Sequence, residues 1–356
     1  MPDLLIETQG ELIAHLGKSK SKTGTPICAI DTEADSLHRY RESLCLIQFA
    51  IAGDCVLIDP LAIKDLSSLS DFLSDATVWM HGADYDMTML KRQFGQLPAK
   101  VYDTQIGARL LGARRFGLGD LVENYFGVEL SKSSQKADWG KRPLSEKMID
   151  YALNDVRYLL EMGEKIVADL KAKDRYSWFE ESCAAAQAKV WERDENRDEA
   201  WRIQGSGKLP PLGLAYLRAL WHWRDREAAS WDKPSFMVVA NRQLIEWCGI
   251  LLDQREVVLP HHYRSDRVKR FKDAVEEVGA LPKSELPQRP QNKRRKRDKD
   301  FDRKVDALLK TRERVATELD IEGSLIAPRA VLEAVAGGES DPADLLLVWQ
   351  RKCLGL

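Results

Sequence analysis

Short apolar runs rich in isoleucine, valine and leucine follow one another early in this 356-residue chain. A Gly-Asp pair at 53–54 separates the second run from the third and predicts a tight hairpin turn. Two further strand-like runs then alternate with helical patterns. This order predicts an α/β domain with a mixed sheet and helices packed on its faces. The predicted strands cover residues 27–31, 44–52, 55–58, 78–80 and 101–102.

Four carboxylates and a tyrosine lie in three short islands of the same half of the chain. They are Asp31 and Glu33 in the first island, Asp86 in the second, and Tyr151 and Asp155 in the third. The first island follows a buried-strand pattern, and the third lies on a helical one, where positions four apart share a face. Gathered carboxylates repel one another unless cations lie between them. Because hard divalent cations prefer oxygen ligands and can clamp a phosphoryl displacement, the islands predict a metal-dependent nuclease.

Composition limits the class of protein. A hydrophobic content of 44% with 31% charged residues is ordinary for a soluble globular protein. The six cysteines are scattered without a C-x-x-C pair, which predicts reduced thiols. The N-terminus lacks a signal-peptide pattern, and no run approaches the roughly 18 apolar residues of a membrane helix. We therefore expect a cytoplasmic protein with no membrane partner.

Helical patterns and their breaks divide the chain into four segments. A helical pattern runs from 176 to about 204, where Gly205-Ser206-Gly207 interrupts it. The basic stretch that comes later has too few apolar residues to fold by itself. The expected segments are an α/β domain at 1–204, a helical domain at 205–282, a basic linker at 283–300 and a second helical domain at 301–356.

The order, spacing and flanks of the acidic islands resemble the DEDD family of 3′→5′ exonucleases, in its tyrosine-bearing branch, and within that branch the ribonuclease D family. The resemblance implies a ribonuclease-H-like exonuclease domain at 1–204. The stretch 223–238 resembles the HRDC module, and 301–356 resembles a second, degenerate copy. The residues that carry the exonuclease resemblance are 27–33, 44–49, 57–60, 81–90, 102–105, Asp138-Trp139, 142–144 and 151–156.

The resemblance also implies a role for each residue of the islands. Asp31 would bridge two Mg²⁺ or Mn²⁺ ions, Glu33 and Asp155 would complete the site of one ion, and Asp86 would hold the other, partly through waters. Tyr151 would orient the attacking water by a hydrogen bond rather than act as a strong base, since a phenol titrates near pH ~10. The product would be a nucleoside 5′-monophosphate released from a 3′ end.

Three nearby residues have other interpretations. Asp84 competes with Asp86, since a carboxylate near a helix start also favours the helix dipole. The family spacing His-Gly-x-x-x-Asp favours Asp86. We interpret Asp103 as a helix cap and His81 as a structural hydrogen-bonding residue.

Two basic clusters are candidate RNA contacts, because Lys and Arg contacts to phosphate dominate affinity for nucleic acids. Solvated surface charge is the alternative interpretation of both. Residues 289–304 hold nine Lys or Arg against three Asp, although the whole chain has a net charge of −2. Trp221 and Trp223 are interpreted as core residues rather than base-stacking platforms. The candidate residues are Arg264, Arg267, Lys269 and Arg270 in the helical domain, and Lys293, Arg294, Arg295, Lys296 and Arg297 in the linker.

The function favoured by the sequence is a 3′→5′ exoribonuclease that trims structured RNA, such as tRNA precursors. A 3′→5′ DNA exonuclease is an alternative, because residues 31–36 also resemble the proofreading exonuclease of bacterial family-A DNA polymerases. The missing polymerase domain and the HRDC-like segments argue against it. A catalytically inactive RNA-binding scaffold is a third possibility, but such a protein is expected to lack one of the five island residues, and all five are present.

Overall fold

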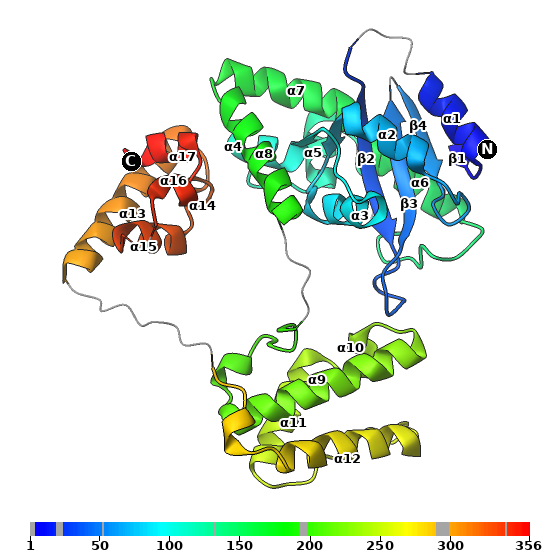
Figure 1. Cartoon of the computed structure of the whole chain (residues 1–356). Helices are drawn as coiled ribbons and strands as arrows, with labels where there is room; N and C mark the ends of the chain where they lie inside the picture. The colour runs from blue at the N-terminus through cyan, green and yellow to red at the C-terminus, as the bar shows by residue number, and fades with distance from the viewer. Residues whose placement is uncertain are drawn as a thin grey trace. The chain divides into compact units, whose positions relative to one another are not determined.

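A six-stranded mixed sheet forms the centre of the first half of the chain (Figure 1). The strands are β1 (Leu5–Ile6), β2 (Ile27–Ala34), β3 (Leu44–Ile51), β4 (Asp54–Ile58), β5 (Thr77–Met80) and β6 (Lys100–Asp103). Their order in the sheet is β1-β4-β3-β2-β5-β6. The pairs β2–β3 and β3–β4 are antiparallel, whereas β2–β5, β5–β6 and β1–β4 are parallel.

The predicted hairpin is present in the sheet. The computed structural model describes residues 4–18, 24–51, 53–131, 133–192, 198–289, 299–338 and 340–356. Within these ranges β3 and β4 pair antiparallel with Ile51 opposite Asp54, which confirms the hairpin. Gly53 in its turn has a φ of 91°, a left-handed conformation that glycine adopts without steric cost.

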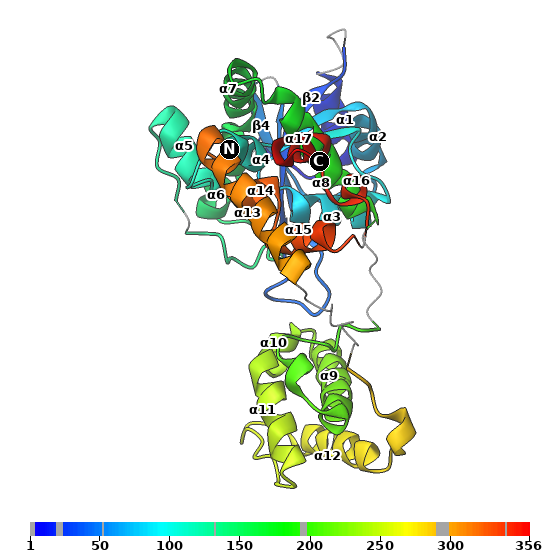
Figure 2. The same ribbon diagram turned by 90° about the vertical axis from the view of Figure 1, so that its left-hand side faces the viewer.

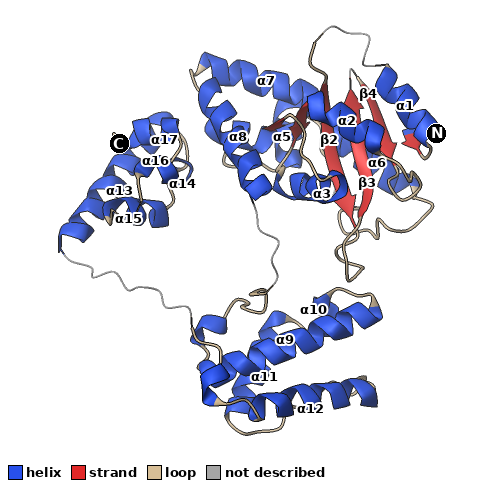
Figure 3. Ribbon diagram, viewed as in Figure 1, coloured by secondary structure: helices blue, strands red, loops and turns tan. Residues whose placement is uncertain are grey.

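Helices cover both faces of the sheet (Figure 3). Alternation along β2 sends Cys28 and Ile30 into one apolar core and Ala29 into the other. The first core includes side chains of α1 (Gln9–Gly17), α2 (Ser67–Asp75) and α3 (Asp84–Phe94). The opposite face packs against α4 (Thr104–Leu110), α5 (Leu118–Phe126), α6 (Glu146–Arg157), α7 (Leu159–Ala172) and α8 (Tyr176–Glu192).

The C-terminal segment belongs to the same compact unit as the α/β domain. This unit comprises Met1–Ala34, Leu44–Arg193 and Arg295–Leu356. The sequence predicted a separate helical domain at 301–356, but Ala316 and Trp349 share one apolar core with Phe179 of α8. The helices of this segment are α13 (Lys299–Leu319), α14 (Gly323–Ile326), α15 (Arg329–Ala336), α16 (Pro342–Leu345) and α17 (Val348–Leu354).

Trp349 at the start of α17 is one anchor of this packing. Its ring stacks on Trp178 of α8, with the ring centroids 5.0 Å apart and an interplanar angle of 11°. The backbone N–H groups of Val348 and Trp349 donate to the carboxylate of Glu181 at 2.6 and 3.3 Å. A carboxylate at a helix N-terminus satisfies N–H groups that have no partner within the helix. The α8–α17 contact is therefore both apolar and hydrogen-bonded.

Arg175, just before α8, is a second anchor. Its buried guanidinium donates to the backbone carbonyls of Leu110 at 2.6 Å and Leu319 at 2.7 Å. Gly112 lies against the C-terminal end of α13, which is at Leu319. A Cβ added at Gly112 would come within 2.4 Å of the backbone oxygen of Asp320. The backbones of the two segments thus approach closely at this point.

Residues Asp35–Ser43 and Asp194–Arg294 form the second compact unit. Its helices pack together in Figure 2. At its core, the buried ring of Trp223 contacts the rings of Trp247, Tyr263 and Phe271. Trp221 is half-buried against the same core, so the interpretation of both tryptophans as core residues is confirmed. The helices are α9 (Pro211–Trp231), α10 (Ser235–Val238), α11 (Asn241–Leu252) and α12 (Ser265–Gly279).

Segment boundaries differ in places from those expected. The helical pattern predicted to reach residue 204 is wrong at its end, because α8 stops at Glu192 and residues 198–204 form turns. Trp201 there is buried in the core of the second unit, so its apolar side chain serves a different core from that of α8. Arg289, at the start of the expected linker's charge run, donates to two backbone carbonyls of the second unit, both at 2.8 Å. Across the described ranges, no helix has the length and apolar character needed to cross a membrane.

Candidate active site

Three of the four carboxylates meet where β2 passes beneath α6. Asp31 and Glu33 lie two apart on β2 and therefore point to the same face of the sheet. The predicted strand ended at residue 31, whereas β2 runs to Ala34 because it stays paired with β3 through a register shift at Glu33/Ala34. Asp155 comes from α6. Carboxylate oxygens of Asp31, Glu33 and Asp155 lie within 4.8 Å of one another.

Asp86 reaches the acidic cluster from α3. Its Oδ1 accepts hydrogen bonds from the backbone N–H of Thr32 at 2.9 Å and from the Thr32 hydroxyl at 2.6 Å. The helix begins at Asp84, so that Asp84 is exposed while Asp86, half a turn further on, is buried. Thr32 therefore ties Asp86 to the strand that carries Asp31 and Glu33. Sequence reasoning missed this role, although Thr32 stands between the two acids.

The carboxyl groups of the cluster have raised pKa values, because they are buried and lie close to one another. Burial and the charges of Asp86, Asp155 and Glu33 raise the pKa of Asp31 well above its ordinary value. Burial and the charges of Asp155 and Asp86 raise the pKa of Glu33 to about 9. Burial, together with Asp86, also raises the pKa of Asp155. Carboxylates shifted in this direction by burial and by like charges are typical of functional sites, and a bound cation would reverse the shift.

Tyr151 lies one helical turn before Asp155 on α6. Its half-buried ring packs near Trp139, with the ring centroids 6.1 Å apart. Burial and the charges of Asp155, Glu33 and Asp31 raise the pKa of the Tyr151 phenol above its ordinary value. The phenol therefore stays protonated at neutral pH and is suited to hydrogen bonding rather than to removing a proton.

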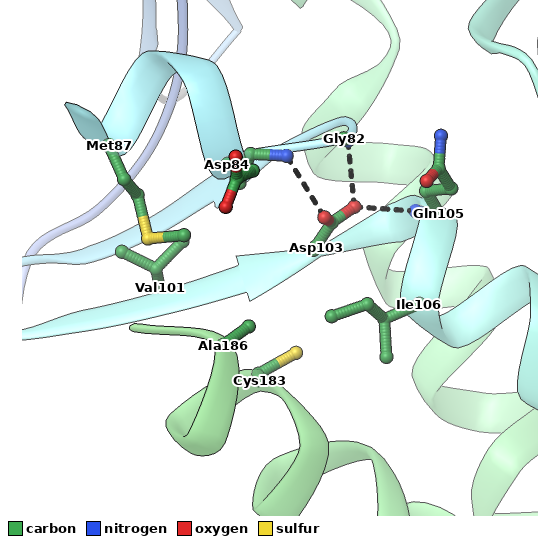
Figure 4. Close-up of a pocket in the computed structure, with 10 residues that line it drawn as sticks. Gly82, Asp84, Met87, Val101, Asp103, Gln105, Ile106, Cys183 and Ala186 are labelled. Atoms are coloured by element: carbon green, nitrogen blue, oxygen red, sulfur yellow. Dashed lines mark hydrogen bonds between the residues drawn. The ribbon is translucent and has the colours of Figure 1, made fainter. Parts of the chain in front are cut away.

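Asp103 connects the turn before α3 with the start of α4 (Figure 4). It was predicted to cap a helix, which is confirmed, because it is the N-cap of α4 and accepts from the N–H of Gln105 at 2.8 Å. The same carboxylate also accepts from the N–H groups of Gly82 at 2.9 Å and Ala83 at 3.0 Å. Gly82 has a φ of 67°, so this turn needs glycine. Asp103 thus fixes the position from which α3 presents Asp86.

We expect Asp103→Ala to lower both stability and activity. The substitution removes an N-cap and leaves three backbone N–H groups without their acceptor, a loss of about 2–4 kcal/mol. Denaturant unfolding would measure this loss, with Asp84→Ala on the exposed side of α3 as a control that should cost about 1 kcal/mol or less. Equal effects of the two substitutions would show that the Asp103 hydrogen bonds do not hold the turn.

Arg142 anchors the segment that leads into α6. Its guanidinium donates to both carboxylate oxygens of the buried Asp59, at 2.5 and 2.8 Å. It also donates to the backbone carbonyls of Cys45, Trp139 and Lys141 at 2.7, 2.7 and 2.8 Å. Bidentate pairs of this kind add geometric specificity to the charge attraction. The clamp fixes the approach of α6 to β3, and sequence reasoning found these residues only as family flanks.

His81 lies at the end of β5 and makes a local hydrogen bond. Its Nδ1 lies 2.9 Å from the hydroxyl oxygen of Thr104, and burial lowers the pKa of the imidazole. Within the described residues it is not a member of the acidic cluster. This placement agrees with its interpretation as a structural residue.

The candidate RNA contacts of the second unit have different environments. Arg264 and Lys269 are exposed. Arg267 and Arg270 form ion pairs with the buried Glu227 at 3.0 and 2.5 Å, so part of their charge is neutralised within the fold. An RNA-binding role for these four residues stays a prediction. The linker residues Lys293, Arg294, Arg295, Lys296 and Arg297 lie outside the described residues.

Comparison with known proteins identifies relatives along most of the chain. A family model described as 3′-5′ exonuclease matches residues 6–171. Ribonuclease D of Sphingobium indicum is 30% identical over 98% of this chain and 91% of that protein. Ribonuclease D of Escherichia coli is 33% identical over 74% of this chain and 72% of that protein.

Solved structures share the architecture. The crystal structure of Escherichia coli RNase D, described as an exoribonuclease involved in structured RNA processing, superposes with a TM-score of 0.75 at 26% identity. The match covers 99% of this chain and 98% of that one. A protein from Bifidobacterium adolescentis has a TM-score of 0.81 at 24% identity, over 99% of this chain and 94% of that one. The likeness to the Bifidobacterium adolescentis protein supports the fold alone.

Proposed function

Since this chain belongs to the ribonuclease D family of 3′→5′ exonucleases, we propose that its four carboxylates and Tyr151 form the centre that hydrolyses RNA from the 3′ end. The protein is a 3′→5′ exoribonuclease. The observation that best supports the assignment of the site is the approach of Asp31, Glu33 and Asp155 within 4.8 Å from two different elements.

The donor set of the cluster fits a hard divalent cation. Asp31, Glu33, Asp86 and Asp155 offer only oxygen atoms, which Mg²⁺ and Mn²⁺ prefer over softer donors. When bound, two such ions activate water and neutralise charge on the scissile phosphate. We assign Asp31 to both ions, Glu33 and Asp155 to one, and Asp86 to the other. Both hydrogen bonds from Thr32 use Oδ1 of Asp86, so Asp86 would hold the ion through Oδ2.

The remaining residues of the site position the reaction. Tyr151 would hold the attacking water by a hydrogen bond in line with the phosphorus–oxygen bond that breaks. Water attacks phosphorus and loses a proton, the bond from phosphorus to the 3′ oxygen of the shortened chain breaks, and that oxygen takes up a proton. A nucleoside 5′-monophosphate would be released. Thr32, Asp103 and the Arg142–Asp59 pair keep β2, α3 and α6 in place around it.

Structured RNA, such as a tRNA precursor, is the proposed substrate. Support comes from the likeness to Escherichia coli RNase D over nearly the whole chain. The HRDC-like second unit and the basic linker at 283–300 would add affinity through phosphate contacts, with Arg264 and Lys269 among the exposed cations of the second unit.

Matched substrates test this function directly. The full-length protein is incubated with 5′-labelled single-stranded RNA and DNA of one sequence, with Mg²⁺, with Mn²⁺ and with EDTA. We expect a ladder of RNA products shortened from the 3′ end, nucleoside 5′-monophosphates as the small product, and no reaction with EDTA. Faster degradation of DNA would favour the DNA exonuclease, and RNA binding without hydrolysis would favour the scaffold.

Tyr151→Phe should cost less activity than the loss of a metal ligand. The ring still packs near Trp139, and only the water-orienting hydroxyl is lost. Positioning effects of this kind are worth roughly 10²–10⁴-fold in rate. Single-turnover kinetics should show slower hydrolysis with unchanged RNA affinity. An unchanged rate would mean that the tyrosine serves packing alone.

A further inference from the structure

Gln48 on β3 is a polar residue in apolar surroundings. Its side chain has 0% exposure, and within the described ranges neither its Nε2 nor its Oε1 has a hydrogen-bond partner. Its neighbours on the same face of β3 are Leu46 and Ala50. Its partner on the adjacent strand β4 is Leu57. Buried polar side chains are nearly always hydrogen-bonded, so an amide left unpaired at both ends requires an explanation.

On β2, the partner of Gln48 is Asp31. Antiparallel pairing of β2 and β3 sets the two residues directly opposite each other. Residues paired in this way project from the same face of the sheet, with their Cβ atoms about 4.5–5.5 Å apart. Among the described residues, no hydrogen bond reaches the side-chain carboxylate of Asp31. A buried donor without an acceptor therefore faces a carboxylate without a donor.

We propose that Gln48 is a positioning residue for Asp31, whose amide Nε2–H donates to the Asp31 carboxylate in the metal-loaded enzyme. This inference rests on the proposed metal site. A donor held on β3 would fix which oxygens of Asp31 face the ions, and hydrogen bonds to ligating carboxylates commonly have this effect. The hydrogen bond is charge-assisted, so it is stronger than one between neutral groups.

Gln48→Met separates this role from packing. Methionine keeps the length and approximate volume of glutamine but removes the amide, and a buried polar group without partners is unfavourable in the metal-free protein. The melting temperature without metal should therefore stay equal to that of the wild type or rise. The affinity for Mn²⁺, followed by the paramagnetic resonance of free Mn²⁺, should instead fall about 10- to 100-fold. Metal affinity would thus fall without any loss of stability in the metal-free protein.

Leu46→Met is the matched control. Leu46 is equally buried, lies on the same face of β3 and pairs with Glu33, but it has no amide to lose. Its substitution should leave Mn²⁺ affinity within about twofold of the wild type, since volume-conserving swaps are well tolerated. Kinetics adds a second readout. For Gln48→Met we expect a lower kcat on single-stranded RNA with KM little changed, because the Gln48 side chain is fully buried and therefore not accessible to substrate.

The outcomes are distinguishable. Equal Mn²⁺ affinity and equal kcat in Gln48→Met and the wild type would overturn the role of Gln48, even with the metal site intact. Gln48→Leu gives the same comparison if the methionine variant does not fold. If the wild type bound no Mn²⁺, the proposed metal site itself would be refuted.

Discussion

Asp31→Asn is expected to abolish RNA hydrolysis while the protein stays folded. An amide replaces the charge of the carboxylate assigned to both ions, and it cannot serve as a bridging ligand. Because each bound metal contributes several kcal/mol to stabilisation of the transition state, the rate should fall by at least about 10³-fold. Single-turnover hydrolysis of 5′-labelled RNA would measure the loss. Hydrolysis at the wild-type rate by a variant with a normal melting curve would refute the assignment of Asp31.

The same substitution should make the metal-free protein more stable at neutral and higher pH. The pKa of Asp31 is raised, and that of Glu33 is raised to about 9, by burial first and then by neighbouring charges. A carboxyl group with a raised folded-state pKa stabilises the fold when protonated, and this stability is lost as the pH rises through the folded-state value. The metal-free wild type should therefore lose stability from the ordinary carboxyl range up to about pH 9.

Asp31→Asn replaces a buried carboxyl group, whose ionisation the fold disfavours, with an amide that does not ionise. Its melting temperature in EDTA should therefore depend less on pH and exceed that of the wild type at pH 8. Adding Mn²⁺ should stabilise the wild type more than the variant, by mass action on the native state. If wild type and variant showed the same pH dependence in EDTA, ionisation of Asp31 within the cluster would not be the cause of the pH dependence.

Trp349→Ala is expected to have the largest effect on stability, about 3–5 kcal/mol. The side chain is buried, stacks on Trp178 and donates its indole N–H to the Ser182 hydroxyl at 3.2 Å. Its removal opens a cavity in the core that the C-terminal helices share with α8. Denaturant unfolding followed by far-ultraviolet circular dichroism would measure the change.

The control for Trp349 is Trp191→Ala, a tryptophan of the same unit that is 54% exposed. Its substitution should cost about 1 kcal/mol or less. Because the core is shared, Trp349→Ala should lower the unfolding midpoint of the whole unit. The temperature at which exonuclease activity is lost on heating should fall as well. A variant in which activity survives to the wild-type temperature would contradict a shared core.

Parts of the arrangement of the proposed site follow from local patterns. The alternation of β2 places Asp31 and Glu33 on one face whichever strand pairs with it, and the helical period of α6 places Tyr151 beside Asp155. The choice of Asp86 over Asp84 rests on the family spacing His-Gly-x-x-x-Asp, and it agrees with the burial of Asp86 and the exposure of Asp84 on α3. Periodicity is displayed directly by the sequence, but the predicted strand ended at Asp31, so the place of Glu33 on β2 was not predicted from it.

The supporting contacts could not be predicted in this way. Gln48 faces Asp31 only because of the register between β2 and β3, and Thr32 meets Asp86 only because α3 packs beside β2. The helical periodicity of 301–356 indicated an apolar face but not which surface covers it. Such relations join residues distant in sequence, so no local pattern contains them.

Anomalous diffraction from crystals grown with Mn²⁺ and a nucleoside 5′-monophosphate would show directly whether the four carboxylates of the cluster hold two metal ions. Two Mn²⁺ peaks are expected at the cluster, with Asp31 bound to both, Glu33 and Asp155 bound to one, and Asp86 near the other. The phosphate of the nucleotide should contact the ions, and Tyr151 should face the position of the attacking water. Well-occupied Mn²⁺ peaks elsewhere on the protein, with none among these four carboxylates, would contradict the proposed metal site.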